Sequence, residues 1–119
     1  MWVMTTDGFY SAVRDLHDKD YVFVRARRRG DLDNLNEKLN ASHKIIVNPN
    51  ADYRYRIRLS KREWGVYMFE YAEDIEYHNF KSAVAKVSRE HANAYHHVWD
   101  VMYDLQITEE RDANISSIS

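Results

Sequence analysis

The chain has 119 residues, a net charge of −2 and no cysteine. This length is typical of one domain, and 45% hydrophobic residues are enough to build a core. The absence of cysteine excludes disulfides, thiolate catalysis and cysteine-bound metals. No apolar run approaches the ~20 residues of a membrane span, and the N-terminus does not resemble a signal peptide, so we expect a cytoplasmic protein.

The charges are unevenly distributed along the chain. Residues 1–60 carry a net charge of +3, and residues 61–119 carry −5. Eleven of the 17 basic residues are arginines, and four of these fall within Arg25 to Arg29. Arginine pairs well with planar anions. The chain is too acidic overall to coat DNA, but it allows a local anion site.

The first half of the sequence predicts a series of strands with one helix. Trp2–Thr5 and Phe9–Val13 form a predicted hairpin around the turn Asp7-Gly8. Alternation predicts a strand over Tyr21–Arg28, and Gly30-Asp31 then begins a helix that carries leucines at 32, 35 and 39. Lys44–Val47 is a short predicted strand, and a turn follows at residues 48–52.

The second half begins with the clearest strand and continues as helices. In residues 53–59 the apolar face is Tyr53, Tyr55, Ile57 and Leu59, and the other face is Arg54, Arg56 and Arg58. Ser60 and Glu63 form a capping box before an amphipathic helix that runs from Trp64 to Ile75. Asn79 is the expected cap of one longer helix, whose stripe is Phe80, Val84, Val87, His91, Ala94, Val98, Met102 and Leu105.

This order of elements predicts an α+β fold with a ferredoxin-like split βαβ core, an N-terminal β-hairpin and two C-terminal helices. The right-handed crossover rule makes strands 21–28 and 43–48 parallel, with strand 53–59 inserted between them. The expected domain covers residues 1–107. Residues 108–119 are polar and are predicted to form a flexible tail.

The arginines are the first candidate site. If strands 21–28 and 53–59 pair, Arg25, Arg27, Arg54, Arg56 and Arg58 form one basic surface on the helix-free face, with Tyr21 and Phe23 beside them. Such a surface suits phosphate or single-stranded RNA. The alternatives are arginines that pair with carboxylates and cover the sheet with their alkyl stems, and arginines at a protein interface.

The histidines give a weaker case. His96 and Asp100 have i, i+4 spacing, which makes His96 a candidate for acid–base chemistry. His91 and His96 lie about 140° apart around a helix, so they cannot bind one metal from a single face. The sequence contains no metal, phosphate-loop, dinucleotide or nucleophile motif, so we expect no metal and no cofactor, and a non-enzymatic protein is favoured over an enzyme.

Several segments together resemble a widespread group of short bacterial and phage proteins that has no assigned activity. They are Met4–Ser11, Val24–Arg27 leading to Asp31-Leu32, Ala51–Arg56, Ile75–Lys81, Ala94–Trp99 and Tyr103–Gln106. The resemblance implies a shared fold and no particular reaction. It also implies that Arg25, Arg27, Tyr53, Tyr55, Arg56, Asn79, Lys81, His96 and Trp99 belong to the group's pattern.

Taken together, the sequence predicts a small non-enzymatic binding module, such as a phage-encoded or defence-related inhibitor that acts by protein–protein contact. The candidate partner-binding residues are Tyr55, Asn79, Lys81, Trp99 and Tyr103. The alternatives are an RNA-binding or RNA-cleaving protein, with arginines on phosphates and His96 as acid–base group, and a nucleotide sensor that uses the same arginines.

Overall fold

The structure is a computed structural model that describes residues 1–118. The chain divides into two compact units, Met1–His78 (unit 1) and the chain from Asn79 onward (unit 2). The predicted domain limits, residues 1–107 and 108–119, stay a prediction, because two compact units of one chain can belong to the same domain.

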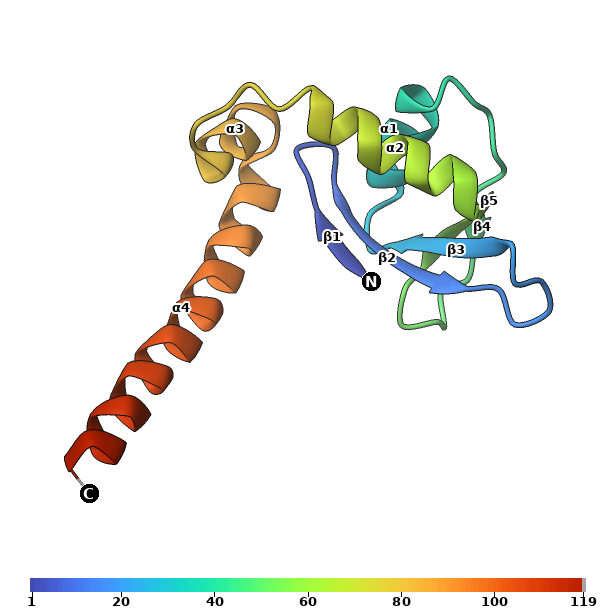
Figure 1. Ribbon diagram of the computed structural model, residues 1–119. Coiled ribbons are helices and arrows are strands. Elements are labelled where there is room, and N and C mark those ends of the chain that lie inside the picture. The colour runs from blue at the N-terminus through green and yellow to red at the C-terminus, as the bar shows by residue number, and fades with distance from the viewer. Residues whose placement is uncertain (119) are drawn as a thin grey trace. The chain divides into compact units, whose positions relative to one another are not determined.

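Unit 1 is an antiparallel five-stranded sheet with two helices (Figure 1). The strands follow the sheet order β1-β2-β3-β5-β4, so the protein is an α+β protein, as predicted. The elements in chain order are β1 (Trp2–Met4), β2 (Phe9–Arg14), β3 (Tyr21–Ala26), α1 (Arg29–Lys38), β4 (Ile46–Val47), β5 (Tyr55–Ser60) and α2 (Lys61–Glu73).

The central pairing is the one that the sequence predicts. β5 lies between β3 and β4 and is antiparallel to both, so β3 and β4 run in the same direction. The N-terminal hairpin adds β2 to the other side of β3. Two strands are shorter than predicted, since β3 ends at Ala26 instead of Arg28 and β4 consists of two residues.

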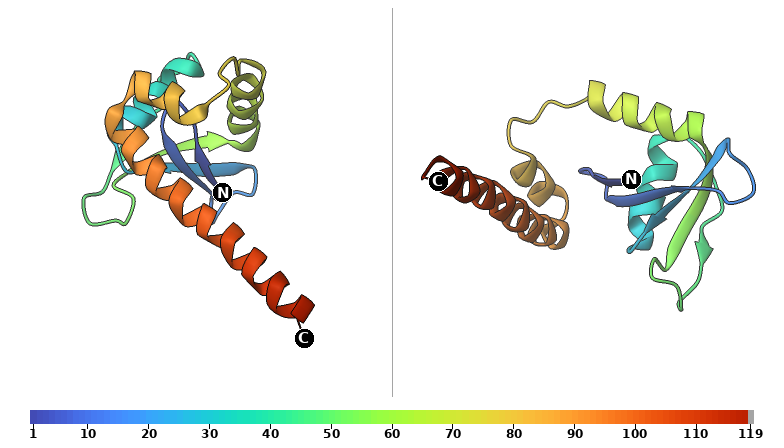
Figure 2. Two further views of the ribbon diagram at one scale, coloured as in Figure 1. Left: turned by 90° about the vertical axis from the view of Figure 1, so that its left-hand side faces the viewer. Right: turned by 60° about the horizontal axis from the view of Figure 1, so that its bottom comes forward.

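The hydrophobic core lies on one face of the sheet. Alternate residues of β2, β3 and β5 are buried there against α1 and α2, and both helices lie on this side in Figures 1 and 2. The buried residues that form this cluster are Tyr10, Ala12, Val22, Val24, Ala26, Leu32, Leu35, Ile57, Leu59, Trp64 and Tyr67. No helix of unit 1 packs on the opposite face, where every other residue of the same strands points.

Ser60 fixes the transition from β5 to α2. Its hydroxyl accepts a hydrogen bond from the Glu63 backbone N–H at 3.0 Å, as a capping residue should. The Glu63 side chain lies 2.6 Å from His43 Nε2 instead of closing a reciprocal capping box. The helix start is therefore predicted correctly, while the role of the Glu63 carboxylate is different.

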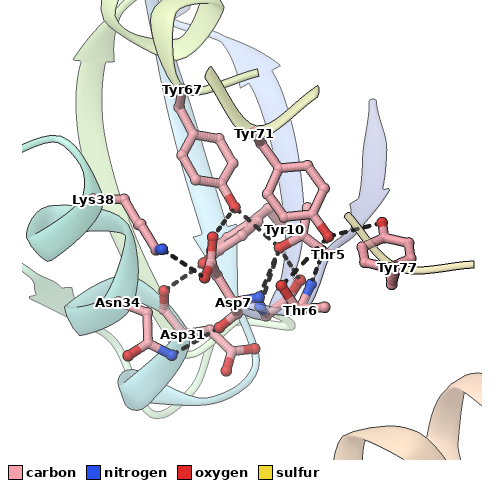
Figure 3. A network of polar contacts seen from close by, with 11 residues as sticks. Thr5, Thr6, Asp7, Tyr10, Asp31, Asn34, Lys38, Tyr67, Tyr71 and Tyr77 are labelled. Carbon is pink, nitrogen blue, oxygen red and sulfur yellow. Dashed lines mark hydrogen bonds and ion pairs between the residues drawn. The ribbon is translucent and has the colours of Figure 1, made fainter. Parts of the chain in front are cut away.

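A tyrosine network fixes the β1–β2 turn onto the helices (Figure 3). The Tyr67 hydroxyl donates to the Asp7 carboxylate at 2.8 Å and lies 3.0 Å from Thr5 Oγ1. The Tyr71 hydroxyl accepts from the Thr6 backbone N–H at 3.0 Å and lies 3.1 Å from the Tyr77 hydroxyl. The pKa of Tyr77 is raised to about 12, mainly because the hydroxyl is partly buried and secondly because of this contact with Tyr71. At neutral pH the Tyr77 hydroxyl is therefore uncharged.

Helix α1 holds the same turn from the other side. Asn34 donates from its side chain to the Asp7 carbonyl at 2.8 Å, and Asp31 accepts from the Phe9 backbone N–H at 3.0 Å. The approach is so close that a Cβ atom on Gly8 would lie 2.4 Å from Asp31 Cγ. Gly8 is required here for space and not for backbone conformation, since no glycine of the chain has a positive φ.

Unit 2 contains α3 (Phe80–Val87) and α4 (Arg89–Ile118), whereas the sequence analysis expects one continuous helix (Figure 1). Ser88 interrupts the helix with extended backbone angles, φ −152° and ψ 111°. Its hydroxyl accepts from the His91 backbone N–H at 3.2 Å and lies 2.7 Å from His91 Nδ1. The prediction of one helix is wrong because Ser88 acts as an N-cap. Asn79 caps α3 as predicted, accepting from the Ser82 backbone N–H at 2.9 Å.

Residues 108–118 of the predicted tail belong to α4. Whether this segment is flexible stays a prediction. Among the described residues no helix combines the length and the apolar character that a bilayer crossing needs.

Replacing Gly8 with alanine tests the close approach of the turn to α1. We expect Gly8→Ala to lower the free energy of unfolding by about 1–3 kcal/mol, because the new methyl group overlaps the Asp31 side chain. Gly65→Ala is the matched control, since nothing lies within 4 Å of a Cβ at that helical position. It should raise stability by about 0.5–1 kcal/mol. Equal effects in urea denaturation would contradict the close packing of Gly8.

Candidate functional site: an arginine–aromatic sheet face

The helix-free face of the sheet carries arginines on two neighbouring strands. In the β3–β5 pairing Arg25 is directly opposite Arg56, and Phe23 is directly opposite Arg58. These residues alternate with the buried Val22, Val24, Ile57 and Leu59, so their side chains point away from α1 and α2. We call the surface formed by Tyr21, Phe23, Arg25, Tyr53, Arg56 and Arg58 the arginine–aromatic face.

Each arginine of this face lies over an aromatic ring. The Arg58 guanidinium carbon is 3.7 Å from the Tyr21 ring centroid, and that of Arg56 is 5.9 Å from the Phe23 centroid. The guanidinium groups of Arg25 and Arg27 lie 4.6 and 4.2 Å from the Tyr53 ring centroid. A guanidinium group over a ring keeps its N–H groups in its own plane, where they remain available to an acceptor.

Two of the arginines near this face are neutralised by carboxylates. Arg58 Nε donates to Asp15 at 2.8 Å, and a second nitrogen of Arg58 lies 3.6 Å from Asp18. Hydrogen bonding from Arg58 lowers the pKa of the Asp15 carboxyl, and the same bond raises the pKa of Arg58. Arg27 is 3.2 Å from Asp52, in a pair that is largely exposed. These contacts agree with the alternative in which surface arginines pair with acids.

Arg25 and Arg56 have no such partner among the residues that the structure describes. Within residues 1–118 no carboxylate lies at ion-pair distance from either guanidinium group. Arg25 donates to the buried Ser11 hydroxyl at 2.8 Å, and its Nε is buried without a hydrogen-bond partner among the described residues. Like charges directly opposite in a sheet are destabilising. An anion between the two side chains would relieve this repulsion.

Not all of the predicted arginines reach this surface. Arg25, Arg56 and Arg58 do, while Arg27 follows the end of β3 and contacts the face through Tyr53. Arg54 is exposed and precedes β5, so strand pairing does not assign it to a face. Tyr53 is predicted on the apolar face of its strand, but β5 begins only at Tyr55, and Tyr53 packs beneath the guanidinium groups.

The predicted partner-binding residues fall into different environments. Tyr55 packs against the core of unit 1, and the Asn79 side chain caps α3. Lys81, Trp99 and Tyr103 do lie together in unit 2. The Lys81 ammonium is 4.5 Å from the Trp99 ring centroid, and the Trp99 and Tyr103 rings stack at 5.2 Å.

His96 lies on α4 next to this aromatic group. Its Nε2 is 3.6 Å from Asp100, and its ring stacks on Trp99 at 6.0 Å between centroids. The imidazole and the carboxylate are both about half exposed. His91 is held by Ser88, which agrees with the structural role that its position suggests. Across residues 1–118 no three His, Cys, Asp or Glu side chains are grouped so that they could hold a metal ion.

α4 exposes a set of apolar residues whose exposure could not be predicted from the sequence. Val98, Met102 and Leu105 are 38%, 57% and 61% exposed, although they belong to the apolar stripe that the periodicity predicts for this helix. Helical periodicity indicates that a stripe faces something, but not whether the same chain supplies the covering element. Ser88 is a residue type that favours helix N-caps, so it was the sign in the sequence that the stripe is divided between two helices.

Comparison of the chain with family models, with curated proteins and with solved structures found no match.

The Asp15–Arg58 pair predicts that stability depends on acid pH. Because the folded-state pKa of Asp15 is lowered, its contribution is complete above the ordinary carboxyl pKa of about 3.9 and is lost as the pH falls through the lower folded value. Asp15→Asn should therefore flatten the fall in unfolding free energy between roughly pH 5 and 3. The control Asp20→Asn removes an exposed carboxylate that has no ion pair among the described residues. The unfolding free energy is measured by urea denaturation at each pH. If Asp20→Asn flattens its pH dependence as much as Asp15→Asn does, the assignment to the Asp15–Arg58 pair is wrong.

Proposed function

We propose that the protein is a non-enzymatic binding module whose arginine–aromatic face binds a phosphate-bearing ligand. One observation carries this proposal. Arg25 and Arg56 lie directly opposite each other, and no carboxylate of the described residues is within ion-pair distance of either one. Guanidinium groups match phosphate oxygens through paired N–H donors. A phosphate placed between the two side chains would accept hydrogen bonds from both and reduce the repulsion between them.

Single-stranded RNA is the phosphate ligand that fits this face best. The surface presents guanidinium planes that lie over aromatic rings, and guanidinium planes stack on unpaired bases. It is a sheet face without a covering helix in unit 1, so an extended strand of nucleotides can lie across it. We propose RNA before a free nucleotide because the arginines and aromatic rings extend along two strands, beyond the Arg25–Arg56 pair that one phosphate would contact.

We also propose that the sheet is a variant of the ferredoxin-like fold. The order β2-β3-β5-β4, with α1 and α2 on one side, corresponds to such a sheet if β2 takes the place of its last strand. Four-stranded sheets of this kind bind single-stranded RNA on their helix-free face. The relation supports the choice of face and says nothing about the bound sequence.

The test is RNA binding by the double variant Arg25→Ala plus Arg56→Ala. We expect the wild-type chain to bind a labelled single-stranded oligonucleotide in fluorescence anisotropy, with affinity that falls as salt rises. Removing both guanidinium groups from the phosphate between them should weaken binding at least about tenfold and reduce the salt slope by about 0.7. The single variant Arg56→Ala should show part of this loss without disturbing Ser11, since the hydrogen bond to Ser11 comes from Arg25.

The charge-matched control is Lys61→Ala plus Arg62→Ala, which removes two exposed positive charges at the start of α2. It should retain the wild-type affinity and salt slope. If it loses as much binding as the face variant, the interaction is a general charge effect. If the wild-type chain binds no RNA at low salt, the proposal fails, and the same assay with nucleoside triphosphates tests the nucleotide alternative.

A second candidate function is protein–protein contact through α4, as in the inhibitor that the sequence analysis expects. The observation that favours it is the set of exposed apolar and aromatic side chains on this helix, among them Val98, Trp99, Met102 and Leu105. Exposed apolar patches on small proteins commonly mark interaction sites. The proposed membership of a bacterial and phage protein group is compatible with an inhibitor of this kind.

Affinity capture tests the second candidate. We expect immobilised wild-type protein to retain a specific partner from a lysate of the organism that encodes it, identified by mass spectrometry. Met102→Glu plus Leu105→Glu should lose that partner, because the carboxylates remove the apolar contact. Asn93→Glu plus His97→Glu changes exposed positions on the other side of α4 and should retain it. Equal retention by all three forms would reject this function.

A further inference from the structure

Helix α4 is much longer than the helix that packs against it. It has 30 residues and α3 has 8, which correspond to about 45 and 12 Å. The Tyr95 side chain is buried and its ring stacks on Phe80 of α3 at 5.7 Å between centroids, and His91 lies against Tyr95. In unit 2 the α3–α4 contact therefore involves the first part of α4.

The side of α4 that contacts α3 continues beyond that contact as an apolar stripe. Tyr95, Val98, Met102 and Leu105 follow one another at spacings of three, four and three residues, which is the seam spacing of paired helices. Tyr95 is 6% exposed, while the next three residues range from 38% to 61%. The stripe thus passes from a covered part to an uncovered part along one face.

The charges along unit 2 are separated lengthwise. Residues 79–97 contain Lys81, Lys86 and Arg89 against Glu90 alone. Residues 98–118 contain five carboxylates against Arg111 alone, and Glu109 and Asp112 continue the line of the apolar stripe. A second copy in the same direction would bring the acidic halves together. A copy in the opposite direction would bring each acidic half to a basic half.

We propose that a second copy of this chain covers the stripe, with the two α4 helices antiparallel and Val98 of each copy opposite Leu105 of the other. The occupant is a second copy because its unit 2 supplies both a matching apolar stripe and the complementary charges. With α3 of each copy alongside, the assembly is a four-helix arrangement whose core extends the Phe80–Tyr95 contact. The inference names the partner for the second candidate function and therefore rests on it. It is independent of RNA binding by unit 1.

Molar mass in solution tests the pairing with the full chain. At roughly 100 µM, above the micromolar dissociation constants typical of small interfaces, light scattering should give twice the chain mass of 14.2 kDa. Met102→Glu plus Leu105→Glu should give a single chain mass. Asn93→Glu plus His97→Glu, with the same two added carboxylates away from the stripe, should remain dimeric. Because the replaced residues are exposed, circular dichroism should show the same folded signal in all three forms.

The orientation is tested by disulfide formation, which is selective because the chain has no cysteine of its own. Met102→Cys lies near the two-fold axis of the antiparallel pair and should form a covalent dimer on mild oxidation. Asp112→Cys would lie about 30 Å from its equivalent in that pair and should stay monomeric on a non-reducing gel. In a parallel pair both variants would be linked.

A wild-type chain of single mass at this concentration overturns the proposal, and so does rapid linkage of Asp112→Cys. Neither result decides the second candidate function, which fails separately if affinity capture finds no partner that depends on the stripe. A dimer that survives Met102→Glu plus Leu105→Glu would place the interface elsewhere and would also overturn the proposal.

Discussion

The pairing of β3 with β5 determines both the core of unit 1 and its candidate site. The register that puts Val24 opposite Ile57 on the helix side also puts Arg25 opposite Arg56 on the other side. Strand side chains alternate, so a shift by one residue would bury the arginines beneath α1 and α2 and expose the aliphatic residues. The free energy of core burial therefore holds two like charges together. Stacking on Tyr53 and Phe23 offsets part of this repulsion, and Ser11 satisfies one guanidinium nitrogen.

The Ser11 contact depends on a distant part of unit 1. Ser11 reaches Arg25 because β2 pairs with β3 in a register that places these two residues opposite each other. The turn that begins β2 is in turn held by Asp31 of α1 and by the hydroxyls of Tyr67 and Tyr71 of α2. A fully bonded polar network specifies one arrangement more strictly than apolar packing does. The tyrosine network thus acts as a positioning element for the arginine–aromatic face, although it lies on the helix side of the sheet.

Much of this arrangement could be read from alternation and capping residues. The repeated arginines of Tyr55–Ser60 predict its two faces, and Ser60 and Asn79 predict the starts of two helices. The errors arise where a local hydrogen bond or the end of a strand overrides the periodicity. Ser88 ends one helix and begins another because its hydroxyl satisfies a backbone N–H. Tyr53 continues the alternation in the sequence but precedes the strand, so its ring is free to turn beneath two arginines. Ion pairing could not be predicted either, because the loop that brings Asp15 to Arg58 has no regular period.

The uneven charge of the sequence acquires a structural explanation in the two proposed surfaces. The excess of positive charge in residues 1–60 includes Arg25 and Arg56, which form no ion pair with the described part of the chain. The excess of negative charge in residues 61–119 includes the five carboxylates of residues 98–118. These charges could attract each other between copies, but an apolar stripe would gain nothing from contact with a charged sheet face. Antiparallel pairing of α4 satisfies the stripe and the carboxylates at once and leaves the arginines available to phosphate. Because burial of apolar surface tolerates salt while phosphate contacts are weakened by it, the two interactions respond differently to ionic strength.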